Sequence, residues 1–198
     1  SVTISILIAW VNGYALANWR FKGADIFFTI LIVGAFIPYQ VMIYPIVIIL
    51  REIGLYGTLQ GLIIVHTIFG MPILTLLFRN YFASLPEELF KAARIDGANF
   101  WQIYLRIMLP MSLPIFVVAM ILQVTGIWND FLFGVVFTRP EYYPVTVQLN
   151  NIVNSVQGVK EYNVNMAATI LTGAVPLIVY FVSGRLFVRG IAAGAVKG

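Results

Sequence analysis

Long uncharged stretches separated by short polar ones dominate this sequence. Ile26–Leu50 and Leu59–Phe78 contain no charged residue, and Met108–Phe137 and Met166–Val188 contain one each. A stretch of about 20 apolar residues is long enough to cross the hydrocarbon core of a bilayer as a helix. Val2–Ala17 is a shorter candidate of the same kind. The pattern therefore predicts an all-α, polytopic membrane bundle with five spans, formed by a single domain over residues 1–198.

Prolines lie within or at the start of four of the five apolar segments. They are Pro38 and Pro45, Pro72, Pro110 and Pro114, and Pro176. Each removes a backbone donor and therefore bends or breaks a helix. The pattern is compatible both with ordinary packing kinks and with helices that line a passage.

The basic residues predict an orientation in the membrane. If the loop after the first segment is cytoplasmic, nine of the twelve Lys and Arg residues lie inside: Arg20, Lys22, Arg79, Lys91, Arg94, Arg106, Arg185, Arg189 and Lys197. The other three, Arg51, Arg139 and Lys160, lie outside. This distribution follows the positive-inside rule. The net charge of +4 is thus attributed to topology and not to nucleic-acid binding.

Little in the composition supports an enzyme. The chain has no cysteine and one histidine, His66, so a disulfide, a zinc site or a cysteine–histidine nucleophile is excluded within this chain. The phosphate-loop pattern G-x-x-x-x-G-K-[ST] is absent as well. We expect no catalytic residues, no metal site and no ATPase site of its own.

Four polar residues inside or near the spans are candidates for a solute pathway. Tyr39 and Gln40 lie between two prolines, and Asn129 and Asp130 follow a tryptophan. An aspartate near the bilayer centre costs about 2.5–3.5 kcal/mol on insertion scales, so Asp130 should face a cavity, a partner helix or the outer interface. Both a structural role and a solute contact stay open for it. For His66 a hydrogen bond between helices is the favoured interpretation.

The segment 138–164 is the long connection predicted on the outer side. It contains Pro, Asn and Gly residues and the adjacent pair Tyr142 and Tyr143. It is compatible with a simple connector and with a landing surface for a soluble partner.

The passage 84–110 is unusually charged for this chain. Ser84 and Glu87 have the spacing of a capping box, and Glu87 and Glu88 would occupy the first turn of a helix. Leu89, Ala92 and Ala93 would share one face, and Asp96-Gly97 would end the helix.

A second apolar stripe follows in the same passage. Phe100, Ile103, Tyr104 and Ile107 have helical spacing, which predicts a second amphipathic helix after a glycine bend. Such a pair could rest in the lipid headgroup region or dock into a groove of another protein. The mixed charge and the small Ala-Ala face favour docking.

This passage resembles the EAA loop of permease subunits in binding-protein-dependent ABC importers. The pattern E-A-A-x-x-x-G-x9-I-x-L-P is matched by Lys91-Ala92-Ala93, Gly97, Ile107, Leu109 and Pro110, with Lys91 in place of the usual Glu. The segments Gly13–Gly23, Leu50–Thr58, Trp128–Phe133 and Val188–Gly198 look like the carbohydrate-importing, maltose-type branch. The resemblance implies a type I importer permease fold with six spans, of which the first would be missing here.

The resemblance also implies a role and partners. Residues that would couple to an ATPase are Glu87, Glu88, Lys91, Ala92, Ala93, Arg94, Asp96, Gly97, Ile107, Leu109 and Pro110. The expected partners are two ATPase subunits that bind ATP and Mg, a second homologous permease, an extracytoplasmic sugar-binding protein, membrane lipid and the sugar. The passage 84–110 and the C-terminus would face the cytoplasm of a bacterial cell, across its inner membrane. An ion-coupled carrier or channel, and a membrane scaffold without transport activity, are the alternatives.

Overall fold

The computed structural model of the protein describes residues 1–19, 21–154 and 161–195, with side chains up to residue 184. Arg20, Lys160 and Lys197, and the side chains of Arg185 and Arg189, lie outside this description. The orientation predicted from the basic residues stays a prediction. Apart from one isolated bridge between Gly57 and Thr138, the described secondary structure is helical. The all-α prediction is confirmed for these residues.

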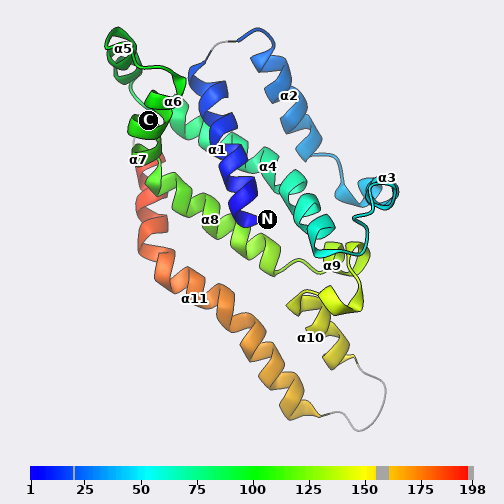
Figure 1. Ribbon diagram of the computed structural model, residues 1–198. Helices are drawn as coiled ribbons and strands as arrows, with labels where there is room; N and C mark the ends of the chain where they lie inside the picture. Colours follow the sequence, from blue (N-terminus) through cyan, green and yellow to red (C-terminus); the bar gives the residue numbers. More distant parts are fainter. Residues whose placement is uncertain (20, 155–160, 196–198) are drawn as a thin grey trace.

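The helices follow one another along the chain in the order shown in Figure 1. They are α1 (Val2–Asn18), α2 (Ala24–Ala35), α3 (Tyr39–Glu52), α4 (Leu59–Ala83), α5 (Glu87–Ile95), α6 (Phe100–Ile103), α7 (Leu109–Met111), α8 (Leu113–Trp128), α9 (Leu132–Phe137), α10 (Val145–Val153) and α11 (Tyr162–Ala195). A π-helical turn, Tyr104–Met108, joins α6 to α7, and a 3-10 turn, Pro140–Tyr142, precedes α10. The predicted outer connection 138–164 therefore contains the 3-10 turn and α10.

The helix α1 lies at the centre of the bundle, packed along α4 and against α8 (Figure 1). Gly13 permits this close approach, because a Cβ atom there would lie 2.5 Å from the Cβ of Phe78 on α4. The helix α11 runs beside α8 in the opposite direction.

Two of the described helices, Leu59–Ala83 and Tyr162–Gly184, are each long and apolar enough to cross a membrane. Two bent pairs would raise the number to four, by length and composition alone: α2 with α3, at 103°, and Phe100–Met111 with α8, at 76°. The helix α1 is apolar but shorter, with 17 residues. The count of five spans stays a prediction.

The prolines act differently from one another. Pro38 separates α2 from α3, and Pro110 and Pro114 flank the bend before α8, so these breaks are confirmed. Pro45 and Pro72 instead lie inside the continuous helices α3 and α4.

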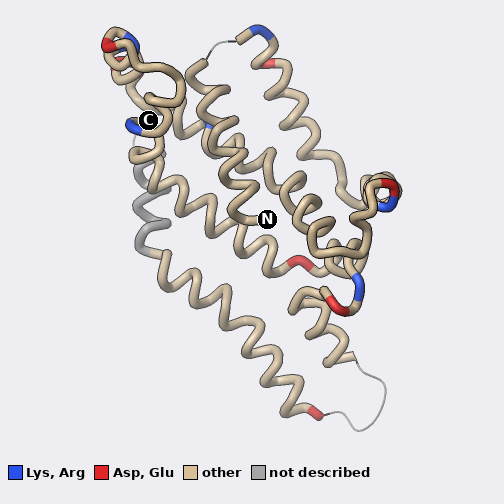
Figure 2. Tube along the Cα trace, in the orientation of Figure 1, with Lys and Arg blue, Asp and Glu red and all other residues tan. Residues whose placement is uncertain are grey.

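Charged residues gather mainly at the two ends of the bundle, and the helices between them are largely uncharged (Figure 2). The helix α5 lies at one end, and the connection between α9 and α10 lies near the other (Figure 1). This is the charge distribution expected of a bundle that crosses a lipid bilayer.

Candidate functional site

The helix α5 forms where the sequence predicts it, with charges that suit its dipole. Glu87 and Glu88 occupy its first turn and Arg94 its last. The predicted capping box starts at Ser84, but the structure begins α5 after Pro86. Ser84 instead closes α4, and its hydroxyl donates to the carbonyl of Tyr81 at 2.7 Å. The helix α5 follows Pro86, which gives no side-chain cap.

A capping box does occur at the next helix. The Asn99 side chain accepts from the backbone N–H of Gln102 at 3.0 Å, and the Gln102 side chain accepts from the N–H of Asn99 at 2.8 Å. Asn and Gln three residues apart have the required spacing, so the signal was present in the sequence.

Gly97 makes the bend between α5 and α6, as predicted. Its φ is +78°, a left-handed conformation that favours glycine. The N–H groups of Gly97 and Ala98 donate to the carbonyls of Arg94 and Ala93, both at 3.0 Å, which satisfies carbonyls at the end of α5.

The helix α5 packs against the bundle through Phe90 and Ala93. Phe90 and Ala93 are 5% and 7% exposed, whereas Leu89 and Ala92 lie on the surface. Of the face predicted to dock into another protein, Leu89 and Ala92 thus remain on the surface, whereas Ala93 is buried within this chain. The bulky Phe90 sets the rotation of the helix because it enters the aromatic core.

Tyr14 of α1 is the centre of that core. Its ring lies 5.9 Å from Phe82 of α4, 6.3 Å from Phe90 of α5 and 4.7 Å from Phe100 of α6, between ring centroids. Its hydroxyl donates to the carbonyl of Phe100 at 3.3 Å. One side chain thus joins four helices, and it holds the 84–110 passage against the bundle.

The second stripe of the passage is confirmed in its central part. Ile103 and Tyr104 are buried, and Phe100 and Ile107 pack partly buried against the same core. The π-helical turn that follows was not predicted. Leu109 is half-buried and Pro110 is exposed at the start of α7. The hydroxyl of Tyr81 donates to the carbonyl of Met111 at 2.5 Å, which ties this joint to α4.

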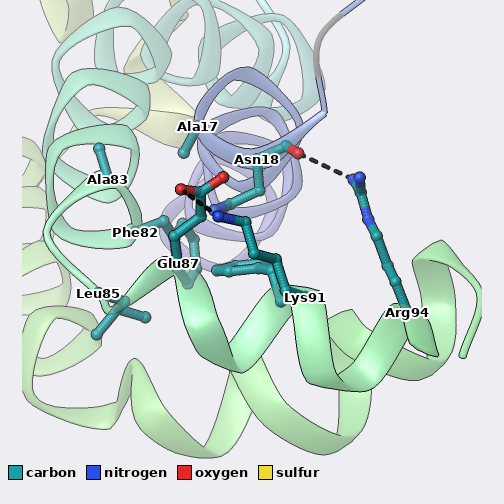
Figure 3. A pocket seen from close by; sticks show the side chains of 9 residues that line it. Ala17, Asn18, Phe82, Ala83, Leu85, Glu87, Lys91 and Arg94 are labelled. Carbon is teal, nitrogen blue, oxygen red and sulfur yellow. Dashed lines mark hydrogen bonds and ion pairs between the residues drawn. The ribbon is translucent and has the colours of Figure 1, made fainter. Parts of the chain in front are cut away.

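A cavity of about 360 Å³ lies between the ends of α1 and α4 and the helix α5 (Figure 3). Its lining includes Asn18, Glu87, Lys91 and Arg94. Lys91 pairs with Glu87 at 3.1 Å within α5, where both side chains are exposed. A surface pair of this kind contributes only about 0.3–0.5 kcal/mol. The ion pair of Lys91 thus lies within α5.

Asp130, a predicted pathway residue, has a structural role at the break between α8 and α9. Its carboxylate accepts from the N–H groups of Phe133 at 3.1 Å and Gly134 at 3.0 Å, which caps α9. It also lies 3.5 Å from Nε2 of His66 on α4, with the two side chains 13% and 8% exposed. His66 therefore joins α4 to this break, in line with the role between helices expected for it.

The other pathway candidates lie at helix ends. Tyr39 begins α3 and packs edge-on against Phe133 and Phe69, with centroids 5.5 and 6.4 Å apart. Gln40 and Asn129 are exposed. Phe133 connects Tyr39 to the segment that Asp130 caps. The contacts of Phe69 and Phe133 with Tyr39 were not predicted, because aromatic residues are common throughout this chain.

Several known proteins are similar to this chain. It is 46% identical, over 83% of its length, to a probable ABC transporter permease protein of Pyrococcus horikoshii. It is 35% identical, over its whole length, to an osmoprotective compounds uptake permease of Synechocystis, and equally to an alpha-glucoside transport system permease of Rhizobium meliloti. The chain spans 60%, 66% and 53% of these three relatives.

Solved structures show the same fold. A bacterial ABC transporter that imports the polysaccharide alginate has a chain that matches 98% of this one, with a TM-score of 0.69 and 23% identity, over 70% of its own length. The methionine ABC transporter MetNI matches 96%, with a TM-score of 0.70 and 18% identity, over 88% of its chain. The model of one family also matches residues 1–193. The chain therefore belongs to the family of binding-protein-dependent transport system inner membrane components.

Proposed function

We propose that this chain is a membrane-spanning permease subunit of an ATP-driven importer for a carbohydrate that an extracytoplasmic binding protein delivers. Membership of the family supports the importer, and relatives named for the transport of alpha-glucosides, xylose and arabinose, and arabinooligosaccharides support the substrate class. A bacterial inner membrane, with the 84–110 passage cytoplasmic, is part of the same proposal.

The observation that carries this proposal is the arrangement of α5. The inner face of the helix is held by Phe90 and Ala93, while Glu88, Leu89 and Ile95 lie on the surface, Ile95 with 85% exposure. The helix lies at one end of an apolar bundle (Figures 1 and 2). A helix fixed on one face and open on the other is suited to receive force from a partner. The partner proposed is an ATPase subunit, one of two that bind ATP and Mg.

The predicted coupling residues then divide into two groups. Glu87, Glu88, Lys91, Ala92 and Asp96 are exposed and available for contact, whereas Arg94, also exposed, donates to the carbonyl of Asn18 at the end of α1. Ala93, Gly97, Ile107, Leu109 and Pro110 shape and support the segment. When the ATPase subunits close on ATP, they push α5. The core around Tyr14 transmits the displacement to α1 and α4, and the spans of this chain and of a second permease change between inward-facing and outward-facing states.

Tyr39, Gln40, Asn129 and Asp130 are proposed to lie along the sugar pathway. The contact of Tyr39 with Phe133 supports a role for the segment that Asp130 caps. In this arrangement Asp130 acts mainly by holding α9, and Tyr39 offers an aromatic ring and a hydroxyl to the sugar.

The test is to purify the full-length protein from its host's membranes in mild detergent, identify the proteins that accompany it, and reconstitute the complex in sealed vesicles. We expect a second permease and two copies of an ATPase, and sugar uptake that requires ATP hydrolysis and the binding protein. A protein recovered alone, with uptake driven by an ion gradient, would reject the importer and favour a carrier or channel.

A further inference from the structure

Arg94, in the last turn of α5, reaches across to the end of α1. Its Nη2 donates to the carbonyl of Asn18 at 3.2 Å (Figure 3), and its guanidinium carbon lies 4.7 Å from the ring centroid of Trp19. The residues are 76 positions apart in the sequence, so this bond joins two separate elements.

The end of α1 is a favourable place for a cation. Asn18 is the last residue of α1, and its carbonyl is among the four that find no partner within the helix. The negative end of the helix dipole lies at the same point. The guanidinium therefore satisfies one exposed carbonyl and complements the dipole, and the face of Trp19 adds a cation–π contact.

Trp19 is contacted from two sides of the 84–110 passage. Arg94 lies over its ring from α5, and the ring of Phe100 from α6 lies 5.1 Å away between centroids. Hydrogen bonds between α1 and the passage are divided in the same way. The hydroxyl of Tyr14 donates to the carbonyl of Phe100 in α6, and the carbonyl of Asn18 accepts from Arg94 in α5.

The contact matters because α5 and α1 are not closely packed beside it. The cavity of about 360 Å³ separates Ala17 and Asn18 from Glu87 and Lys91. The rings of Tyr14 and Phe90 lie 6.3 Å apart between centroids, whereas the hydrogen bond of Tyr14 goes to Phe100 of α6 and not to α5. Lys91 is paired with Glu87 within α5. Among the described residues of α5, Arg94 thus supplies a hydrogen bond to α1, in addition to the packing of Phe90 and Ala93 in the core.

We infer that Arg94 is a positioning residue that carries the displacement of α5 to the end of α1. The inference rests on the proposed function. Its removal leaves Phe90 and Ala93 in the core, so α5 stays in place and available to the ATPase. What is lost is the part of the ATP-driven motion that reaches the end of α1 through Arg94 in addition to the core around Tyr14, so less sugar is moved per ATP hydrolysed.

The experiment compares Arg94→Gln, Arg94→Lys and the native protein in the reconstituted importer, with Lys22→Gln as the matched control. Lys22 is an exposed basic residue that follows α1 and lies outside the proposed coupling residues. We expect Arg94→Gln to retain its ATPase partner and most of the ATPase activity, and to transport about three- to tenfold less sugar per ATP. Arg94→Lys should recover part of the ratio, because an ammonium still complements the helix end without the planar fork of arginine. Lys22→Gln should behave as native.

A second pair of variants tests the route through Trp19. If Arg94 acts through the end of α1, Trp19→Leu should lower the ratio on its own, and Arg94→Gln should add little to it in the double variant. A native ratio in Arg94→Gln, loss of the ATPase partner from that variant, or fully additive losses in the double variant would each overturn the inference. If the native complex itself shows no ATP-dependent uptake, the proposed function fails, whatever the variants do.

Discussion

The left-handed bend at Gly97 can be tested with a graded set of substitutions. The φ of +78° is unfavourable for any residue with a Cβ atom, and a Cβ built at this position meets no atom within 4 Å. The whole effect of a substitution therefore comes from backbone conformation. For alanine the cost is about 1–2 kcal/mol. Asparagine, which tolerates this conformation better, should cost less, and the β-branched valine more.

The expected order of retained function is Gly, Asn, Ala and then Val. A loss of about 1–2 kcal/mol changes the population of the native bend relative to an unwound one by about 5–30-fold. The assay is ATP-dependent sugar uptake by the reconstituted complex, with recovery of the ATPase partner measured in parallel. Gly126→Ala is the control, since Gly126 lies within α8 and a Cβ there also meets nothing within 4 Å. Asparagine and valine differ in how well they tolerate a positive φ, and the size of either side chain should have no effect at this open position. Equal uptake by the two variants would therefore refute the argument.

Two further substitutions test the packing of the bundle through the thermal midpoint of the purified protein in detergent. Gly13→Ala would place a Cβ 2.5 Å from the Cβ of Phe78 and 2.8 Å from the backbone nitrogen of Arg79, so it should destabilise the α1–α4 contact by about 1–3 kcal/mol. In the control Gly34→Ala, in α2, the added Cβ meets no atom within 4 Å, so the midpoint should stay unchanged or rise. Asp130→Ala removes the acceptors for two N–H groups of α9 and should cost about 1–2 kcal/mol, and Asp130→Asn, which keeps one acceptor, should cost less. Equal midpoints for Gly13→Ala and Gly34→Ala, or for the two Asp130 variants, would contradict these expectations.

The features that the sequence predicted correctly are those with local causes. The bend at Gly97 depends on one residue's conformational freedom, and α5 depends on its terminal charges and helical spacing. The apolar stretches are a property of composition over about 20 residues. Such signals do not require knowledge of what packs against the segment.

The features that were wrong or missed depend on distant partners. The burial of Phe90 was missed, because it depends on the contact of Phe90 with Tyr14, which lies on α1. The bond from Arg94 to Asn18 also joins residues far apart in the chain. Ser84 and Asn99 are each followed, three positions later, by a Glu or Gln with capping-box spacing. However, α4 extends through Ala83, and Ser84 is the residue that ends it. The capping-box spacing alone does not show where the preceding helix ends.

Lys91 is the residue at which this chain departs from the EAA pattern. In the pattern that this passage resembles, the position carries a glutamate, so the substitution reverses a charge. Here Glu87 lies 3.1 Å from Lys91, and the two charges compensate each other within α5. Glu88 is exposed in the same first turn and forms no ion pair among the described residues. It lies three positions before Lys91, on a neighbouring part of the helix surface. The outward surface of α5 thus still offers a carboxylate to a partner, supplied one turn earlier than in the usual pattern.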